Sequence, residues 1–583
     1  MEAGALRRPT VLGLLATLSV VVGAVLGGQV FVSALPGSWF FGGPGGLFGS
    51  FTPIGLDTPA LSLFLVFGGL LLLTRSWLTI VRLLRSSPGT SVVWVMGVIA
   101  IWLVPILVAP PLFSKDVFSY AAQGEMVSRH INPYTYGPGV LGATPFNVLA
   151  GPLWANTPSP YGPVFLALDG VTTTLSGHHV LVDVVLLRLM TLIGLALIVA
   201  SLPILARVAG RDPAETLLLG AGSPLILLIG IGGAHNDVLM VGLLVAGLAV
   251  ASRFGTVPGI LLCAAAAGVK APAFLAVLFL GWNWPGRDAS VGARVFGTLR
   301  AGAIGTATLA GLSWASGLGW GWARDLFAGA SVFRSTTPVD AAAHVVTAVL
   351  RVAGSSIALT SVTSVTHVVG LAVFAMLSAF LLVSSPRLGP SCALGLSLLA
   401  LALLGPILWS WYLLWGLVVL STQILGPRLR AGVITVTIAG TFVGTTSVAR
   451  IGEAVAQAGI LNDLLLTIGM VAVAAMPLRG SALRSPNAVG TIHQWTKKPR
   501  RPAMLGPSRG GQTPDRPGHR FIRLLGHRAL AAHRLLQQPL QPTHLGVVTR
   551  PAPRAMNPMP ASTARRVNPN SVKTTPHSTP GAS

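Results

Sequence analysis

The chain has 583 residues, of which 52% are hydrophobic and only 9% are charged, and its mean hydropathy is +0.73. This composition is typical of an integral membrane protein and excludes an ordinary soluble domain. The sequence contains no GxxxxGKS/T, HExxH or CxxC motif, which argues against ATP-driven transport and cytoplasmic nucleotide-sugar chemistry. Two cysteines, Cys263 and Cys392, lie in predicted spans and indicate neither a disulfide framework nor a metal site.

Apolar stretches long enough to cross a bilayer recur along the chain. A span needs roughly 20 mostly apolar residues, and no alternation of period two competes, so we expect helices. The pattern predicts an all-α, polytopic membrane protein with about 13 or 14 spans, where 256–282 forms two short legs. The predicted spans are 11–34, 58–80, 91–110, 179–206, 214–231, 237–252, 256–282, 299–319, 357–384, 391–405, 408–421, 431–448 and 460–477.

The positions of arginine predict the orientation of these spans, because short loops rich in Lys and Arg stay on the cytoplasmic side. With the spans above, most of the arginines near the span ends fall on one side, which places the amino terminus inside. The loop at 111–178 then faces outward and is the longest outer loop. The arginines on the predicted inner side are Arg7, Arg8, Arg75, Arg82, Arg85, Arg207, Arg211, Arg253, Arg287, Arg294, Arg300, Arg387, Arg428 and Arg430.

Residues 478–583 differ in composition from the membrane domain at 1–477. They contain 17 lysines and arginines and a single acid, Asp515, so that about +16 of the formal net charge of +24 lies in this tail. Such a mixture, rich in Pro, Arg and His, is typical of a disordered cytoplasmic tail attracted to anionic lipid headgroups. A shifted reading frame would give the same composition, and a basic tail alone is weak evidence of nucleic-acid binding.

Acidic residues are scarce, which narrows the candidates for general-base chemistry, since that needs a carboxylate, a histidine or a similar group. Of the 15 acids, five are predicted inside and ten on the outer face or at its membrane border. The ten are Asp57, Asp116, Glu125, Asp169, Asp183, Asp237, Asp325, Asp340, Glu453 and Asp463. Asp116 follows the third span by only a few residues. Its carboxylate is therefore expected at the headgroup boundary, where a lipid-linked phosphate would present its sugar.

Charged and aromatic residues surround Asp116 in the stretch FSKDVFSYAAQGEMVSRHINPYTYGP at 113–138. Lys115 and Arg129 offer positive charge to a phosphate. Residues 116–129 indicate an amphipathic helix lying on the membrane, which ends before the proline that follows Asn132. The aromatic residues either form an interfacial belt or stack on a sugar, and an inert surface helix remains the alternative. These aromatic residues are Phe113, Phe118, Tyr120, Tyr134 and Tyr136.

Three motifs carry a resemblance to a known family. They are DVFSYAAQGEMVSRHINPYTYGP at 116–138, PSPYGPVFL at 158–166 and GGAHNDVLMVGLLVAG at 232–247. In this order and topology they resemble the actinobacterial polyprenol-phosphomannose-dependent α-1,6-mannosyltransferases, which belong to the GT-C superfamily of multi-span glycosyltransferases. The resemblance extends over residues 1–477, and the tail has no counterpart.

The resemblance implies that Asp116 is the general base that deprotonates the acceptor hydroxyl of a mannose residue. The donor would be polyprenyl-phosphate mannose, and attack at its anomeric carbon would invert a β-phosphate linkage into an α-1,6 bond. The acceptor would be a phosphatidylinositol mannoside or a mannan of the lipomannan and lipoarabinomannan core, modified at the outer face of the plasma membrane. Phosphate is already a good leaving group, so positioning and charge stabilisation would supply much of the rate.

Residues of other segments extend the candidate site. His235, Asn236 and Asp237 either hydrogen-bond the donor sugar or the acceptor, or cap the following span. Lys270 lies among small and apolar residues, and since charge at membrane depth is costly, we favour a phosphate contact over a snorkelling anchor. Arg188, inside the fourth span, either serves the same phosphate or pairs with a carboxylate such as that of Asp183.

Aromatic and charged residues further along are assigned with alternatives. Tyr161 and the cluster of Trp409, Trp411 and Tyr412 either wall a sugar site or, for the tryptophans, anchor the chain at the interface. The second sizeable outer loop either shapes acceptor binding or forms a solvated surface through Arg324, Asp325 and Arg334.

Glu125 lies nine residues after Asp116, about two and a half helical turns, so it is a poor partner in a two-carboxylate mechanism. With no acid beside Asp116 to share a cation, we predict an enzyme that needs no metal and no cofactor.

Two other functions compete with this prediction. A lipid or solute transporter would also have a dozen helices, but transporters tend to show internal repeats and charges near the midplane, whereas here the titratable groups gather at the outer boundary. Within the enzymes, the rival is a polyprenyl-phosphate arabinose transferase of the same superfamily. Composition does not separate a pentose donor from a hexose donor.

Overall fold

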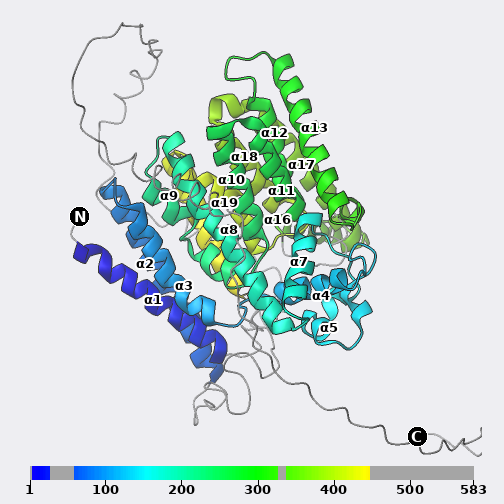
Figure 1. Ribbon diagram of the computed structural model, residues 1–583, viewed down its shortest axis with the longest axis horizontal. Coiled ribbons are helices and arrows are strands. Elements are labelled where there is room, and N and C mark those ends of the chain that lie inside the picture. Colours follow the sequence, from blue (N-terminus) through cyan, green and yellow to red (C-terminus); the bar gives the residue numbers. More distant parts are fainter. Residues whose placement is uncertain (1–2, 27–57, 326–336, 447–583) are drawn as a thin grey trace, which may run out of the picture. The chain divides into compact units, whose positions relative to one another are not determined.

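The computed structural model describes residues 3–26, 58–325 and 337–446, all within the unit Met1–Arg479. These residues form helices and no strands (Figure 1), which confirms the all-α prediction. Several predicted features lie outside the described residues: the span at 460–477, the tail at 478–583, the side chain of Asp325, and Asp57, Arg334, Glu453 and Asp463.

Every predicted span from 58 to 448 coincides with a helix or with a broken pair of helices. The unbroken ones, with α1 at the amino terminus, are α1 (Ala3–Leu26), α2 (Thr58–Ser86), α3 (Val92–Val108), α8 (Val180–Val208), α10 (Asp237–Phe254), α13 (Val291–Ala315), α17 (Leu359–Leu388), α18 (Pro390–Leu404) and α20 (Pro427–Thr446). The broken pairs are α9 (Pro213–Gly220) with η3 (Leu225–Ile231), α11 (Thr256–Val269) with α12 (Phe274–Asn283) across η4 (Ala271–Ala273), and η5 (Ser410–Tyr412) with α19 (Leu413–Ser421).

Among the described helices, six are long and apolar enough to cross a membrane, or seven if the bent pair of α9 and η3 counts as one span. The chain is therefore a multi-pass membrane protein. The larger number expected from sequence includes apolar helices of 10–17 residues, such as α3 and α18. These are shorter than the roughly 20 residues of a straight span, so by length and composition alone they do not count as full membrane spans.

Glycines allow neighbouring helices to approach closely. A Cβ atom on Gly194 of α8 would lie 2.6 Å from the backbone of Leu239 in α10, and one on Gly242 of α10 would lie 2.9 Å from the Cα of Gly194. Likewise, a Cβ atom on Gly281 of α12 would lie 2.9 Å from the carbonyl oxygen of Gly297 in α13. Small residues at helix crossings are the usual packing device of membrane helices, and here they bring α10 close to α8 and α12 close to α13.

Polar contacts join the helix ends that are predicted to lie inside. The guanidinium of Arg211 donates to the carbonyl oxygen of Gln423 at 2.5 Å, and the backbone N–H of Gly89 donates to Asp212 at 2.9 Å. Arg430 pairs with Glu215. These contacts bring together the segments around Gly89, around Arg211 and around Gln423, all of which are predicted to lie inside.

A second set of contacts joins helix ends that are predicted to lie outside. The backbone N–H of Leu112 donates to the carbonyl oxygen of Gly232 at 2.9 Å, and Asn132 donates to that of Leu318 at 3.0 Å. None of the contacts in these two sets joins a predicted inner end to a predicted outer end. The contacts therefore divide the helix ends into the same two groups as the predicted spans do.

The predicted outer loop folds into α4 (Asp116–Ser128), η2 (Pro138–Leu141), α5 (Pro145–Ala150), α6 (Pro152–Ala155) and α7 (Pro163–Leu175); α14 (Gly321–Asp325) and α16 (Pro338–Val352) follow later in the chain. Helix α4 begins at the predicted residue and ends one residue before the predicted end. The expectation that it lies on the membrane as an amphipathic helix is wrong, because every residue from Val117 to Met126 is buried. It packs against α5, α7 and α8 (Figure 1). Its buried Gln123 is satisfied internally, since it bonds to Ser119 and Ser159.

Candidate active site

Asp116 is the first residue of α4, directly after the turn that follows α3. Its backbone N–H donates to the hydroxyl of Ser114 at 3.1 Å, and its side chain is only 15% exposed. Burial raises the pKa of the Asp116 carboxyl to about 7; the charge of Lys270 lowers it and that of Asp237 raises it. A carboxyl group that titrates near neutral pH is suited to accept a proton and to release it again.

His235 faces Asp116 from the connection between η3 and α10. Its Nδ1 is 3.6 Å from Oδ2 of Asp116, and its ring stacks on that of Trp411 with centroids 3.7 Å apart. Gly233 leaves room for this ring, since a Cβ atom there would lie 2.8 Å from it. Burial and the charge of Lys270 both lower the pKa of His235 well below its usual value, so the imidazole is neutral at pH 7.

Lys270 and Asp237 form a buried ion pair beside Asp116. The Nζ of Lys270 is 3.0 and 2.9 Å from the two carboxylate oxygens of Asp237, and Nε1 of Trp415 donates to Oδ1 at 2.5 Å. The ammonium also lies 4.4 Å from the ring centroid of Tyr412, a favourable cation–π distance. Lys270 follows the last residue of α11 and is buried. The alternative of a snorkelling anchor is therefore wrong.

Aromatic rings enclose this centre. Tyr120, one turn after Asp116, has its ring centroid 5.2 Å from that of Tyr161 in an edge-to-face contact, and the hydroxyl of Tyr134 donates to the carbonyl oxygen of Tyr161 at 3.0 Å. Trp411 stacks on Trp409 as well as on His235. Trp411 is buried, so interfacial anchoring does not describe it. It holds the imidazole in place, whereas Tyr412 contacts Lys270.

Two arginines predicted to bind phosphate are occupied elsewhere. Arg129 lies at the other end of α4, about 20 Å from Asp116 along the helix, and its Nε donates to Glu125 at 2.6 Å. Arg188 does not pair with Asp183; it donates to the carbonyl oxygens of Ala109 at 2.5 Å and Gly232 at 3.2 Å. Because it joins the end of α3 to the segment that leads to His235, Arg188 fixes two parts of the site relative to each other.

The remaining predicted residues have separate roles. Lys115 is exposed beside Asp116, and Tyr136 is exposed as well. Arg324 donates to the backbone carbonyl of Tyr134 at 2.5 Å, so it contacts the outer loop that contains α4. Glu125 is paired with His178 as well as with Arg129, which agrees with its exclusion from the catalytic residues.

One premise of the metal prediction is wrong. Asp116 does have a neighbouring acid, since Asp237 is close enough to raise its pKa. That carboxylate is already occupied by Lys270 and Trp415. Within the part of the chain that the structure describes, no group of three or more His, Cys, Asp or Glu side chains is arranged to hold a metal ion. Metal independence stays a prediction.

Trp415, which donates to Asp237, is a site residue that was not predicted from the sequence. It lies four residues after Trp411, a spacing that places two side chains on the same helix face, and this signal was available in the sequence.

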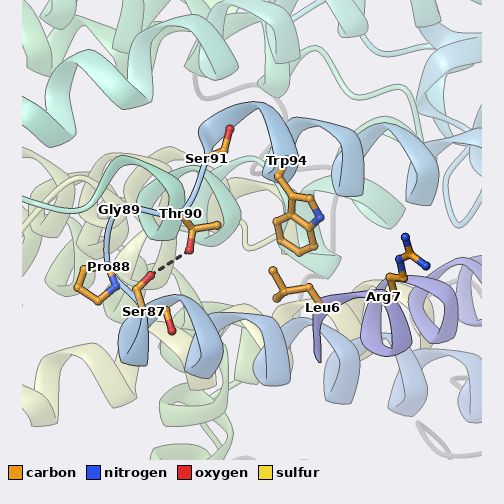
Figure 2. A pocket seen from close by; sticks show the side chains of 8 residues that line it. All are labelled: Leu6, Arg7, Ser87, Pro88, Gly89, Thr90, Ser91 and Trp94. Carbon is orange, nitrogen blue, oxygen red and sulfur yellow. Dashed lines mark hydrogen bonds between the residues drawn. The ribbon is translucent and has the colours of Figure 1, made fainter. Parts of the chain in front are cut away.

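A cavity of about 560 Å³ lies apart from these residues, between the start of α1 and the turn that joins α2 to α3 (Figure 2). Its lining includes Arg7 and Trp94 and the turn Ser87–Ser91. None of the predicted site residues borders it. The cavity lies at helix ends that are predicted to face the cytoplasm.

The fold and the site together define a multi-pass membrane protein with a buried cluster of titratable and aromatic side chains. Residues 10–286 match the family model described as alpha-(1->6)-mannopyranosyltransferase, N-terminal domain, and residues 339–476 match the model described as MptB C-terminal domain. The chain belongs to the alpha-(1->6)-mannopyranosyltransferase family, as the resemblance of its motifs implied, and it is a mannosyltransferase.

Curated relatives support this membership. The chain is 33% identical to the "probable alpha-(1->6)-mannopyranosyltransferase" of Mycolicibacterium smegmatis, over 66% of this chain and 75% of the relative. It is 30% identical to an alpha-(1->6)-mannopyranosyltransferase of Mycobacterium tuberculosis, over 72% of this chain and 81% of the relative. It is 32% identical to alpha-(1->6)-mannopyranosyltransferase A of the same organism, over 64% and 73%. No solved structure matches the chain.

Proposed function

We propose that the chain transfers mannose from a polyprenyl-phosphate mannose donor to a mannoside glycolipid, such as a phosphatidylinositol mannoside, with inversion at the anomeric carbon. The observation that carries this proposal is the environment of Asp116. Its carboxyl group is largely buried, has a pKa of about 7 and faces a neutral imidazole. Such a group is suited to removing a proton from a sugar hydroxyl.

The chemistry is a single displacement. As the 6-hydroxyl oxygen of the acceptor attacks the anomeric carbon of the donor, Asp116 takes the hydroxyl proton. The bond from the anomeric carbon to the phosphate oxygen breaks, and its electron pair leaves with polyprenyl phosphate. Attack from the opposite side converts the β-phosphate into an α linkage. No metal or other cofactor takes part in this scheme.

Lys115 is the proposed contact for the leaving phosphate. It is exposed beside Asp116, whereas Arg129, Arg188 and Lys270 are committed to other groups. An ammonium group near the phosphate stabilises the charge that develops as the bond breaks. Lys270 acts on the reaction through its electrostatic effect on Asp116.

The proposal places the site at the outer face of the plasma membrane. The arginine pattern supports this, because it puts the loop that contains Asp116 on the side opposite the arginine-rich loops. Nucleotide sugars are not supplied outside the cell, so a sugar must arrive there activated on a lipid.

To test the proposal, the reconstituted protein is supplied with labelled polyprenyl-phosphate mannose and an α-1,6-dimannoside. We expect labelled trimannoside that an α-1,6-specific mannosidase digests. Parallel reactions with polyprenyl-phosphate arabinose are expected to give no product. Movement of the donor across the bilayer without sugar transfer would assign the chain to the transporters instead, and preferential use of the pentose donor would contradict the mannose assignment.

A further inference from the structure

Asn236 lies between two residues of the Asp116 centre and is itself unsatisfied. It is 3% exposed, and neither its Oδ1 nor its Nδ2 has a hydrogen-bond partner among the described residues. Although it immediately precedes α10, its side chain makes no capping hydrogen bond. The capping role that the sequence left open therefore does not account for it.

A buried amide without partners is unusual. Buried polar groups are nearly always hydrogen-bonded, and each unsatisfied one costs about 1–3 kcal/mol. Further unsatisfied atoms occur beside Asn236: both ring nitrogens of His235 are buried without hydrogen-bond partners in the described parts of the chain. Asp237, in contrast, is satisfied by Lys270 and Trp415. Adjacent residues next to Asp116 in space, His235 and Asn236, thus share four unsatisfied atoms.

The chemistry of the amide narrows the missing partner. Nδ2 is a donor and Oδ1 is an acceptor, so a ligand must offer both functions side by side. The phosphodiester of a lipid-linked sugar offers acceptors alone and would leave Oδ1 unsatisfied. Two adjacent hydroxyls of a pyranose offer a lone pair and an O–H together.

We propose that Asn236 is a specificity-determining residue that holds two adjacent hydroxyls of a mannosyl residue bound beside Asp116. Nδ2 donates to one hydroxyl, and Oδ1 accepts from the other. The inference rests on the proposed function and deepens it. The mannosyl residue belongs either to the donor or to the acceptor, since both carry vicinal hydroxyls, and the two arms of the experiment distinguish these sources.

The test compares substrates that each lack one hydroxyl. Purified full-length chain in lipid nanodiscs is assayed with monodeoxy forms of the dimannoside in one arm and monodeoxy forms of the donor in the other. In wild type, loss of a hydroxyl held by Asn236 is expected to lower kcat/KM about 10- to 100-fold. In Asn236→Ala, the same deoxy substrate and its parent are expected to react within about 2-fold of each other. Each ratio is measured within one preparation, so protein amounts cancel.

The possible results distinguish a failure of the proposed function from a failure of the role assigned to Asn236. If wild type transfers no mannose, the proposed function fails. If it does transfer mannose and Asn236→Ala retains the discrimination of wild type against every deoxy substrate, the role of Asn236 is refuted. Should the variant turn over no substrate, the readout becomes the rise in melting temperature that dimannoside or donor produces: retained discrimination among the deoxy forms contradicts the proposal, and its loss supports it.

A stability measurement distinguishes substrate recognition from a structural role. Replacing Asn236 with alanine removes unsatisfied atoms, so the ligand-free variant is expected to melt at or above the temperature of wild type. A matched control is Asn283→Ala, because Nδ2 of Asn283 donates to Phe279 at 2.9 Å and to Ser385 at 2.8 Å. This control is expected to melt lower and to keep the deoxy ratios. A fall in melting temperature for Asn236→Ala, with unchanged ratios, would reveal a structural residue.

Discussion

At the scale of single residues, the reactivity of Asp116 follows from the low polarity around it. Burial disfavours its charged form, and the positive charge of Lys270 offsets only part of that effect. The resulting pKa of about 7 keeps a substantial fraction ionised at neutral pH. It also makes the carboxylate a stronger base than one in water.

The pH dependence of the reaction follows from this value. Asp116 must be ionised to accept a proton, so kcat/KM is expected to rise with pH through about 7 and to level off above it. Below that pH, the rate should fall about tenfold per unit. Initial rates measured between pH 5 and 9 check this. A value of kcat/KM that stays constant over this range would indicate a carboxyl with an ordinary pKa of about 4 and would contradict the prediction.

The ion pair of Lys270 and Asp237 predicts a stability pattern. Lys270→Met leaves the Asp237 carboxylate buried without its cation, which is expected to cost about 3–5 kcal/mol. The double variant Asp237→Asn/Lys270→Met removes both charges and should recover most of the loss. Thermal melts in detergent measure this, and a double variant less stable than Lys270→Met would contradict the pairing.

The charged residues of the site were easier to predict from the sequence than the groups to which they bond. Asp116, Asp237 and Lys270 stand out because ionisable groups are rare in apolar segments. The pairing of Arg188 with backbone carbonyls, and of Arg129 with Glu125, depends on which helices become neighbours. A free arginine and a paired one look alike in sequence, so both were assigned to phosphate.

At the scale of elements, α4 is fixed by close packing on α7. A Cβ atom on Gly124 would lie 2.5 Å from the carbonyl oxygen of Asp169, and a backbone atom cannot turn aside as a side chain can. The position of Asp116 at the start of α4 therefore depends on a contact two turns further along the same helix.

Gly124→Ala tests this contact. The added methyl group is expected to push α4 away from α7, to cost about 1–3 kcal/mol and to lower kcat through displacement of Asp116. Gly97→Ala in α3 is the matched control, since a Cβ atom there meets nothing within 4 Å; it should be neutral or slightly stabilising. Melting temperature and initial rate measure both variants, and equal behaviour would exclude the packing argument.

The bounds of α4 were predictable, whereas its burial was not. A starting acid and the proline after Asn132 define the ends, and both are local signals. The polar residues Gln123 and Glu125 indicate a solvated face in sequence, yet they bond to Ser159 and His178 from other segments. The burial of this face of α4 therefore depends on partners that are distant in the sequence.

At the scale of the whole molecule, two sets of contacts gather the predicted inner and the predicted outer helix ends separately. The fold class was predictable because apolar stretches of span length leave few alternatives. The number of full spans was less so, because breaks such as those after Val269 and Gly220 shorten helices inside continuous apolar sequence.

The orientation is tested by labelling single cysteines in spheroplasts. In a chain with Cys392→Ser, Lys115→Cys should react with a membrane-impermeant maleimide, and Asp288→Cys should react only after the membrane is opened. Both positions are exposed, and Cys263 is buried. The opposite pattern would place Asp116 on the cytoplasmic side and overturn the proposed donor.

The turnover of Asp116→Asn tests the central claim most directly, beside Asp212→Asn as the control. Asparagine caps a helix as well as aspartate does, so the control should keep the cap that Asp212 provides for α9 and retain near wild-type kcat. Asp116→Asn, at equal expression in the membrane, is predicted to lose about 10²- to 10⁴-fold in kcat. Full mannose transfer by Asp116→Asn would contradict the account.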